Sequence, residues 1–184
     1  MDTHIWGIIA VLVIICILLI WAYNRGVSYR NYVSEAFSTM DVYLKKRWDL
    51  VPNLIETVKS YTKHEKSLLT DLADIRSSGY ENLSVAEKIN TNLQIGQALS
   101  RVFAVAENYP ELKSNENYVL LMKQMSAVED EIADARRYYN GTVREYNTFL
   151  DVFPTSLIGK IFGMQRAELF EIEAAQRENV KVDM

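Results

Sequence analysis

Residues 118–153 read YVLLMKQMSAVEDEIADARRYYNGTVREYNTFLDVF and carry the most regular apolar pattern in the chain. Apolar side chains recur there at intervals of three and four residues, with one interval of seven. These positions are Tyr118, Leu121, Met125, Val128, Ile132, Ala135, Tyr139, Tyr146, Phe149 and Phe153. The spacing is typical of the seam of a left-handed helical bundle or coiled coil. We therefore expect a long helix that opens near Ser114, stops at Pro154 and packs against other helices.

A second apolar stripe runs through residues 29–75 at the same spacing and predicts a helix over residues 27–78. Pro52 lies inside this stripe. Because an interior proline removes one helical hydrogen bond and clashes with the preceding turn, we expect either a kink there or a break with Asp49 as a new cap.

Two shorter helices complete the pattern. Ser84 and Glu87 form a capping box that opens a helix ending before Pro110. A last helix follows Pro154, with Thr155 or Ser156 as its cap. Its apolar residues are Leu157, Ile158, Ile161, Phe162, Leu169 and Phe170. Within it the segment SLIGKIFGM, residues 156–164, is expected to cap the bundle; lying on a membrane and docking a neighbouring chain are the alternatives.

The composition agrees with helices. The chain of 184 residues is 49% hydrophobic and contains 7 Gly and 3 Pro, too few for an architecture of strands and tight turns. The expected fold class is all-α, with a single N-terminal transmembrane helix followed by an antiparallel up-and-down bundle of about four helices. The expected domains are an anchor at 1–26, a bundle at 27–179 and a short tail at 180–184.

The N-terminal segment has the properties of a membrane anchor. Residues 5–23 contain no charged side chain and span about 28 Å as a helix, close to the hydrocarbon thickness of a bilayer. No Lys or Arg precedes this segment and no small-residue cleavage site follows it, which favours a retained anchor over a signal peptide. The residues assigned to the anchor are Ile5, Trp6, Ile8, Leu12, Ile15, Leu19, Trp21 and Tyr23.

The flanking charges predict the orientation. Arg25 and Arg30 follow the apolar segment and no basic side chain comes before it. The positive-inside rule then places the N-terminus outside and the bundle in the cytoplasm, in a single-pass membrane protein.

A difference in helix lengths suggests self-association. A helix over residues 27–78 would be roughly 78 Å long, whereas the returning helix from Ser84 covers only about 37 Å. The membrane-proximal half would then expose an apolar stripe, which we expect to be an oligomer interface. The residues of this stripe are Val33, Phe37, Met40, Leu44 and Trp48. The alternative is that Pro52 breaks the helix and both halves pack within one bundle.

No catalytic or metal-binding motif is found in the sequence. His64 and Glu65 begin a zinc-protease pattern, but Leu68 occupies the position of the second His. The single Cys lies in the apolar segment, so we expect no enzyme activity, cofactor or metal.

The charged residues give no sign of a nucleic-acid site. A net charge of -4 lacks the basic excess that nucleic acid requires. The triplet Lys45, Lys46 and Arg47 is interpreted as a solvated helix face.

Three runs resemble the LemA family of bacterial membrane proteins: residues 41–65 (DVYLKKRWDLVPNLIETVKSYTKHE), residues 115–121 (NENYVLL) and residues 135–147 (ARRYYNGTVREYN). The closing FGMQRAELFE does so too. The resemblance implies one N-terminal transmembrane helix and an antiparallel bundle, and it brings no catalytic residue. Within these runs Asn53, Asn140 and Asn147 lie among apolar neighbours, where we expect polar contacts between helices.

The sequence therefore predicts a non-enzymatic, membrane-anchored helical protein that self-associates into a homo-oligomeric assembly or scaffold. The alternative is a regulatory adaptor or sensor that binds another membrane protein, such as a protease or kinase. The expected partners are the lipid bilayer, further copies of the chain and other membrane proteins, but not nucleic acid.

Overall fold

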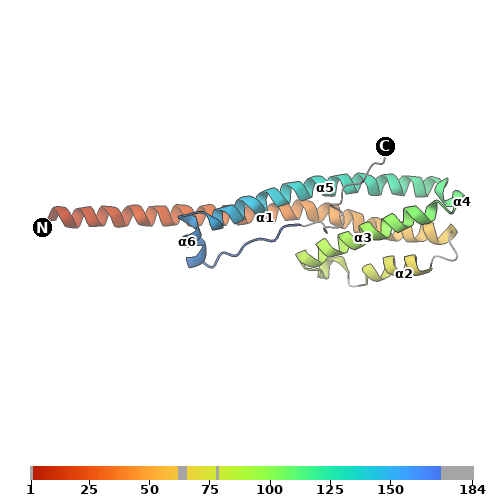
Figure 1. Ribbon diagram of the computed structural model, residues 1–184, viewed down its shortest axis with the longest axis horizontal. Helices are drawn as coiled ribbons and strands as arrows, with labels where there is room; N and C mark the ends of the chain where they lie inside the picture. The colour runs from red at the N-terminus through yellow and green to blue at the C-terminus, as the bar shows by residue number, and fades with distance from the viewer. Residues whose placement is uncertain (1, 62–65, 78, 171–184) are drawn as a thin grey trace, which may run out of the picture. The chain divides into compact units, whose positions relative to one another are not determined.

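The structure is a computed structural model that describes residues 2–61, 66–77 and 79–170, and the part of the chain described is helical without strands (Figure 1). Its elements are α1 (Asp2–Tyr61), α2 (Lys66–Ile75), the 3-10 turn η1 (Tyr80–Asn82), α3 (Val85–Ala106), α4 (Pro110–Lys113), α5 (Glu116–Asp151) and α6 (Thr155–Ile161). The all-α prediction is confirmed. His64 and the predicted tail at 180–184 lie outside the described residues.

Contacts between residues divide the chain into two compact units. The first unit combines the chain up to Ser38 with the chain from Arg136 onward, and the second runs from Thr39 to Ala135. Helices α1 and α5 each contribute to both units.

Helix α1 continues through Pro52 without a break, so a break with Asp49 as a cap did not occur. Proline removes the hydrogen bond that its N–H would have donated to the turn before it. Val51 and Leu54, on either side of Pro52, are fully buried, and this packing offsets the loss.

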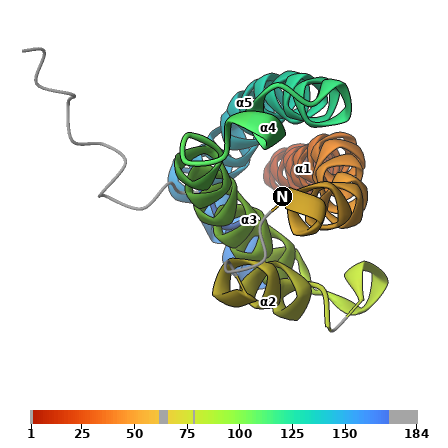
Figure 2. The same ribbon diagram turned by 90° about the vertical axis from the view of Figure 1, so that its right-hand side faces the viewer.

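The prediction of one helix over residues 27–78 is wrong. The structure has α1 up to Tyr61 and a separate α2 from Lys66, which lies beside α3 in the second unit (Figure 1). Viewed end-on, α5, α3 and α2 of the second unit follow an arc around α1 (Figure 2). In the second unit α3 and α5 therefore lie against α1 near Arg47, where a partner was expected to be missing.

The predicted oligomer stripe is accordingly core. Met40 is 0% exposed and Trp48 3% exposed, and Leu44 is buried as well. Val33 and Phe37, in the first unit, are half-buried, and the Phe37 ring lies 5.9 Å from that of Tyr139. Three of the five residues are therefore not exposed, because α5 and α3 cover them in the second unit, and association through Val33 and Phe37 stays a prediction.

The starts of α3 and α5 are capped by side chains. The capping box of α3 is present: the Ser84 hydroxyl accepts the Glu87 N–H, and the Glu87 carboxylate accepts the Ser84 N–H at 2.7 Å. Helix α5 begins at Glu116, near Ser114 as expected, and the Asn115 Oδ1 caps it by accepting the Tyr118 N–H at 3.0 Å. The Asn115 amide also donates to the Tyr61 hydroxyl, which ties the start of α5 to the end of α1.

The first unit is held together by a close approach at Gly26. A Cβ placed there would lie 2.9 Å from the Phe149 ring and 2.8 Å from the Met164 sulfur. The absence of a side chain lets α5 and the segment after α6 reach α1. Next to this contact, the rings of Tyr29 and Phe149 lie 5.5 Å apart.

The last predicted helix is shorter than expected. Helix α6 ends at Ile161, a turn follows at Phe162 and Gly163, and residues 164–170 are not helical. The expected cap is also wrong: Pro154 occupies the cap position, and Thr155 donates its hydroxyl to the Val152 carbonyl at 2.9 Å.

Candidate functional site

The first candidate site is the apolar N-terminal part of α1. It is the one helix of the described chain that is long and apolar enough to cross a membrane, with a mean hydropathy of 3.1 in its most apolar window. All the predicted anchor residues lie on this helix and are exposed, from Ile5 to Tyr23. Soluble surfaces rarely expose a continuous apolar helix of this length, so these side chains are suited to lipid.

The second candidate site is an extended peptide, residues 164–170, held by side chains of α5 in the first unit. The Asn147 amide donates to the Ala167 carbonyl at 2.9 Å, and its Oδ1 accepts the Ala167 N–H at 3.0 Å. The Asn140 amide pairs with Phe170 in the same way, at 3.0 and 2.8 Å. We call Asn140 and Asn147, together with Tyr139, the asparagine clamp.

The clamp fits the geometry of α5. Asn140 and Asn147 are two turns apart and therefore lie on the same face of the helix. The Tyr139 hydroxyl donates to the Glu168 carbonyl at 2.8 Å, between the two asparagine contacts. Burial raises the pKa of Tyr139, and the Glu168 carboxylate raises it further, so the hydroxyl keeps the proton that it donates.

The hydrogen bonds described for the clamp all involve backbone groups of the extended peptide, and one side chain of that peptide is buried. The Phe170 ring is 2% exposed, and the Arg136 guanidinium lies 5.7 Å from its centre. Outside the clamp, Arg166 pairs with Asp151 at 3.0 Å on the surface. Such exposed pairs contribute little to stability.

The asparagines were expected to link helices, and this is wrong for the clamp. Asn140 and Asn147 hold a non-helical segment, whereas Asn53 is exposed on α1. The apolar surroundings of the two asparagines correctly indicated partly buried amides. Their partners could not be found from spacing, because they are backbone groups 20 and 30 residues away.

The second unit contains a buried arginine, Arg47, at a position that was predicted to be solvated. Arg47 was expected on a solvated face but is only 4% exposed. Its guanidinium donates to the Asn92 side chain at 2.8 Å and pairs with Glu129 at 2.7 Å. A Cβ at Gly96 would lie 3.4 Å from that guanidinium, so glycine gives the arginine its room. Burial lowers the pKa of Arg47, and Glu129 opposes the shift.

A second polar cluster in this unit was missed by sequence reasoning. The Tyr80 hydroxyl donates to one oxygen of Asp41 at 2.5 Å, and Lys88 pairs with the other at 2.8 Å. The Tyr80 ring also lies 5.5 Å from that of Trp48. Burial strongly raises the pKa of Tyr80, and the Asp41 carboxylate adds to the shift.

Both polar clusters join different elements of the second unit. In each, a carboxylate pairs with a cation, at Arg47–Glu129 and Lys88–Asp41. The Nε of Arg47 is buried without a hydrogen-bond partner. Among the described residues no group of three or more His, Cys, Asp or Glu side chains is placed to hold a metal ion.

A model of the LemA family matches residues 36–184, which is most of the chain and includes both polar clusters and the clamp. The chain belongs to the LemA family. The sequence resemblance had rested on runs that contain Arg47 and the two clamp asparagines, and the family match covers the same positions.

Individual relatives support the LemA assignment. Magnetosome protein MamQ 2 of Paramagnetospirillum magneticum is 26% identical over 95% of this chain and 74% of its own length. Magnetosome protein MamQ of Magnetospirillum gryphiswaldense is 25% identical over 85% of this chain and 67% of its own length. Protein LemA of Metamycoplasma hominis is 24% identical over 87% and 73%, respectively. With the apolar helix, these matches identify a membrane-associated helical protein of the LemA family.

Proposed function

We propose that this LemA-family chain is a non-enzymatic, membrane-anchored bundle protein that self-associates into a homo-oligomeric assembly or scaffold. The asparagine clamp is the observation that carries the proposal. Side chains of α5 hold an extended peptide through its N–H and carbonyl groups, which every copy of the chain presents equally. The names of the relatives, none of which is an enzyme name, support the non-enzymatic part.

Exchange of residues 164–170 between copies is the proposed means of association. A segment docked on its own chain can dock in the same way on an identical chain, which is a low-cost route to oligomers. Anchoring in one bilayer keeps copies close together and so raises the effective concentration of the segment. A copy whose segment has left its clamp exposes Phe170, and docking on a neighbour buries that ring again.

The orientation in this proposal follows the charges beside the span. Arg25 and Arg30 are the first basic side chains after the apolar segment and both are exposed, which favours a cytoplasmic bundle. Accessibility of an added cysteine on α5 to a membrane-impermeant thiol reagent in intact cells tests this side. Labelling without lysis would contradict a cytoplasmic bundle.

Cross-linking between two co-expressed variants tests the exchange. In a Cys16→Ser background, one copy carries Asp151→Cys and the other Arg166→Cys. These residues form an exposed ion pair outside the clamp, so both changes leave the clamp intact. A short bismaleimide should give covalent dimers from the mixture in membranes, and few from either variant alone.

Two further variants complete the test. Adding Asn140→Ala and Asn147→Ala to both copies should sharply reduce the dimer yield, because the segment loses its backbone partners. The matched control is Asn53→Ala, an exposed asparagine of α1 that should change nothing. Absence of covalent dimers from the mixture of the two cysteine variants, together with a monomeric mass in mild detergent, would overturn the proposal.

The adaptor function is the second candidate. It is favoured by the same observation, that the clamp side chains hydrogen-bond to backbone groups, which any extended peptide presents. Here the clamp accepts an extended segment of another membrane protein in place of residues 164–170. The Asp151→Cys variant would then cross-link to a different polypeptide while the chain itself stays monomeric. A synthetic peptide of residues 162–170 should compete with that product.

A further inference from the structure

The turn between α5 and the extended segment exposes an unusual number of large apolar side chains. We call residues 152–162, from the end of α5 through α6, the elbow. Phe153 is 80% exposed and Ile161 71% exposed. Val152, Leu157 and Phe162 are about half exposed.

The elbow has an inner face that explains its fixed position. Ile158 and Gly159 are buried, and a Cβ at Gly159 would lie 2.9 Å from a methyl carbon of Leu150. Helix α6 therefore packs on α5 through these residues and presents Leu157 and Ile161 outward. A helix that only caps a bundle would turn its apolar residues inward, so the expected capping role accounts for only half of the segment.

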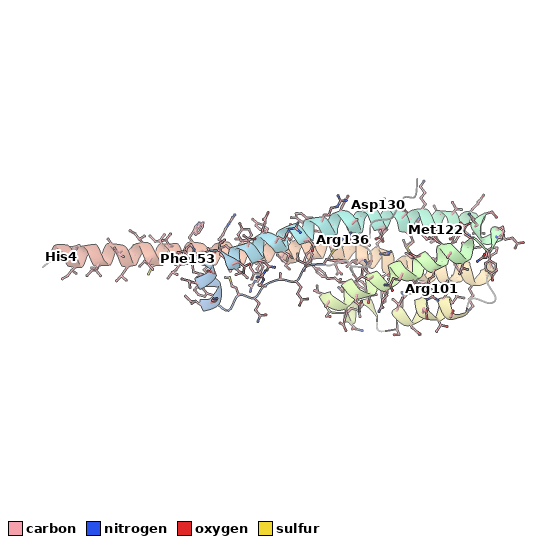
Figure 3. All side chains as sticks on the ribbon, in the orientation of Figure 1. His4, Arg101, Met122, Asp130, Arg136 and Phe153 are labelled. Atoms are coloured by element: carbon pink, nitrogen blue, oxygen red, sulfur yellow. The ribbon has the colours of Figure 1, made fainter. Side chains whose placement is uncertain are left out.

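The elbow lies where the apolar span of α1 ends. The Phe162 ring is 4.6 Å from that of Tyr23, two residues after Trp21 on α1. Figure 3 shows Phe153 at the end of α5 nearest the part of α1 that carries His4. Trp21 and Tyr23 are residues that favour the boundary between headgroups and acyl chains.

An open hollow of about 700 Å³ in the first unit continues this apolar surface. It is lined by Trp21 and Phe149 and by the elbow residue Val152, and the side chains of Arg25 and Arg144 also line it. The Glu145 carboxylate lines the hollow too, so two guanidinium groups face one carboxylate. The apolar walls suit an acyl chain, and the excess of positive charge suits a phosphate headgroup. Lys160 of α6 is exposed and adds a further cation to the elbow.

We propose that the elbow is a second membrane contact, which lies in the headgroup–acyl boundary of the leaflet at the Trp21 end of the span. The occupant of this surface is anionic phospholipid, and the argument is continuity: the surface begins where the lipid-facing helix ends. Short amphipathic helices with aromatic and aliphatic residues on one side and Lys nearby bind membranes in this way. The contact would hold the first unit against the bilayer.

Depth-dependent quenching of a label at residue 153 tests the proposal. The full chain with Cys16→Ser and Phe153→Cys carries an NBD label and is reconstituted in phosphatidylcholine vesicles containing a minority of phosphatidylglycerol. Nitroxide placed near the lipid glycerol group should quench this label severalfold more than nitroxide deep in the acyl chains. The matched control is Ser38→Cys, an exposed site of the same unit about 22 Å further along α1 than Tyr23, which should be quenched weakly.

The outcomes separate the possible occupants. Blue-shifted NBD emission with strong lipid quenching at residue 153 supports the membrane contact. If the label at residue 153 has the emission wavelength of a label in water and is quenched as weakly as that at Ser38→Cys, the proposal is overturned. A label at Leu19→Cys, on the span, must be quenched in the same vesicles to show that the chain is inserted. Blue-shifted emission without lipid quenching also overturns it, since protein would then cover the elbow. Circular dichroism checks that each variant keeps its helices, which is expected because Phe153 makes little contact with the fold.

Discussion

Two stretches of α1 are rich in large apolar residues and differ completely in their surroundings. In residues 5–21 such residues cover the whole circumference of the helix, and all of them are exposed. In residues 40–58 most of the large apolar residues lie in one buried stripe with charged residues between them, and Val42 is exposed. A helix that is apolar all round needs lipid as its solvent, whereas a striped helix needs other helices. The pattern around the helix, not the amount of apolar residue, distinguishes the two.

Truncating one side chain in each stretch should give the largest difference. Trp48→Ala is expected to cost about 3–5 kcal/mol of unfolding free energy, because it empties a fully packed site in the second unit. Leu12→Ala should leave the unfolding of the bundle unchanged, since Leu12 is exposed on the span. Urea unfolding in mild detergent, followed by circular dichroism, measures both. Equal small losses would mean that Trp48 is not core and would restore the stripe as an oligomer surface.

Introducing a charge should reverse the order of the effects, because a charge is harmful in the span and harmless at an exposed position further along α1. Leu12→Arg puts a guanidinium near the middle of the span, at an expected cost of about 2.5–3.5 kcal/mol of membrane insertion. Val42→Arg, at an exposed position of the same helix, should cost almost nothing. The fraction recovered with membranes after carbonate extraction reports insertion. Unchanged recovery of Leu12→Arg would contradict the spanning assignment.

Alkaline pH should give the smallest effect, and only in the bundle. Burial raises the pKa of Tyr80, Tyr118, Tyr139 and Tyr146 above the unfolded value of about 10. The stability from this source is present below pH 10 and is lost as pH rises above it, because the unfolded chain then releases protons more readily. Thermal unfolding followed at several pH values from 8 to 11.5 should show a decline above about pH 10.

A matched variant locates the source of that decline. Tyr80→Phe should flatten it, because Tyr80 has the most strongly raised pKa of the four. Tyr32→Phe is the control, since that ring is exposed on α1. A decline of the same size in Tyr80→Phe would assign the alkaline loss to other groups. Membrane recovery should not follow the decline, because residues 5–20 carry no Asp, Glu, Lys, Arg or Tyr.

Local signals predicted the parts of the fold that depend on neighbours in sequence. The capping box of Ser84 and Glu87 is present, and the periodicity from Tyr118 to Phe149 became α5 with these side chains buried. Spacing alone could not separate α1 from α2, because Val58 and Leu68 fit the same stripe although they belong to two helices. The oligomer stripe had a separate cause: the length comparison counted only the helix from Ser84 and left out α5, which contacts α1 at Phe37 and Arg47.

The clamp and the elbow depend on contacts that spacing does not record. Leu169 and Phe170 suggested that the last helix continues, yet Phe170 is held by Asn140 from a position 30 residues away. Leu157 and Ile161 have a helical spacing that fits a core face as well as a lipid face, and only their exposure in the structure separates the two.

Gly26 lies just after the apolar span of α1, at a position where the neighbouring side chains leave no space for a Cβ atom. At Gly7 and Gly141 an added methyl group would meet open space, and alanine there is sterically free. At Gly26 it would collide with the Phe149 ring, which is itself stacked near Tyr29 and has little freedom to yield. The three glycines therefore differ in how they tolerate a Cβ atom: alanine fits at positions 7 and 141, whereas at position 26 it requires neighbouring side chains to move.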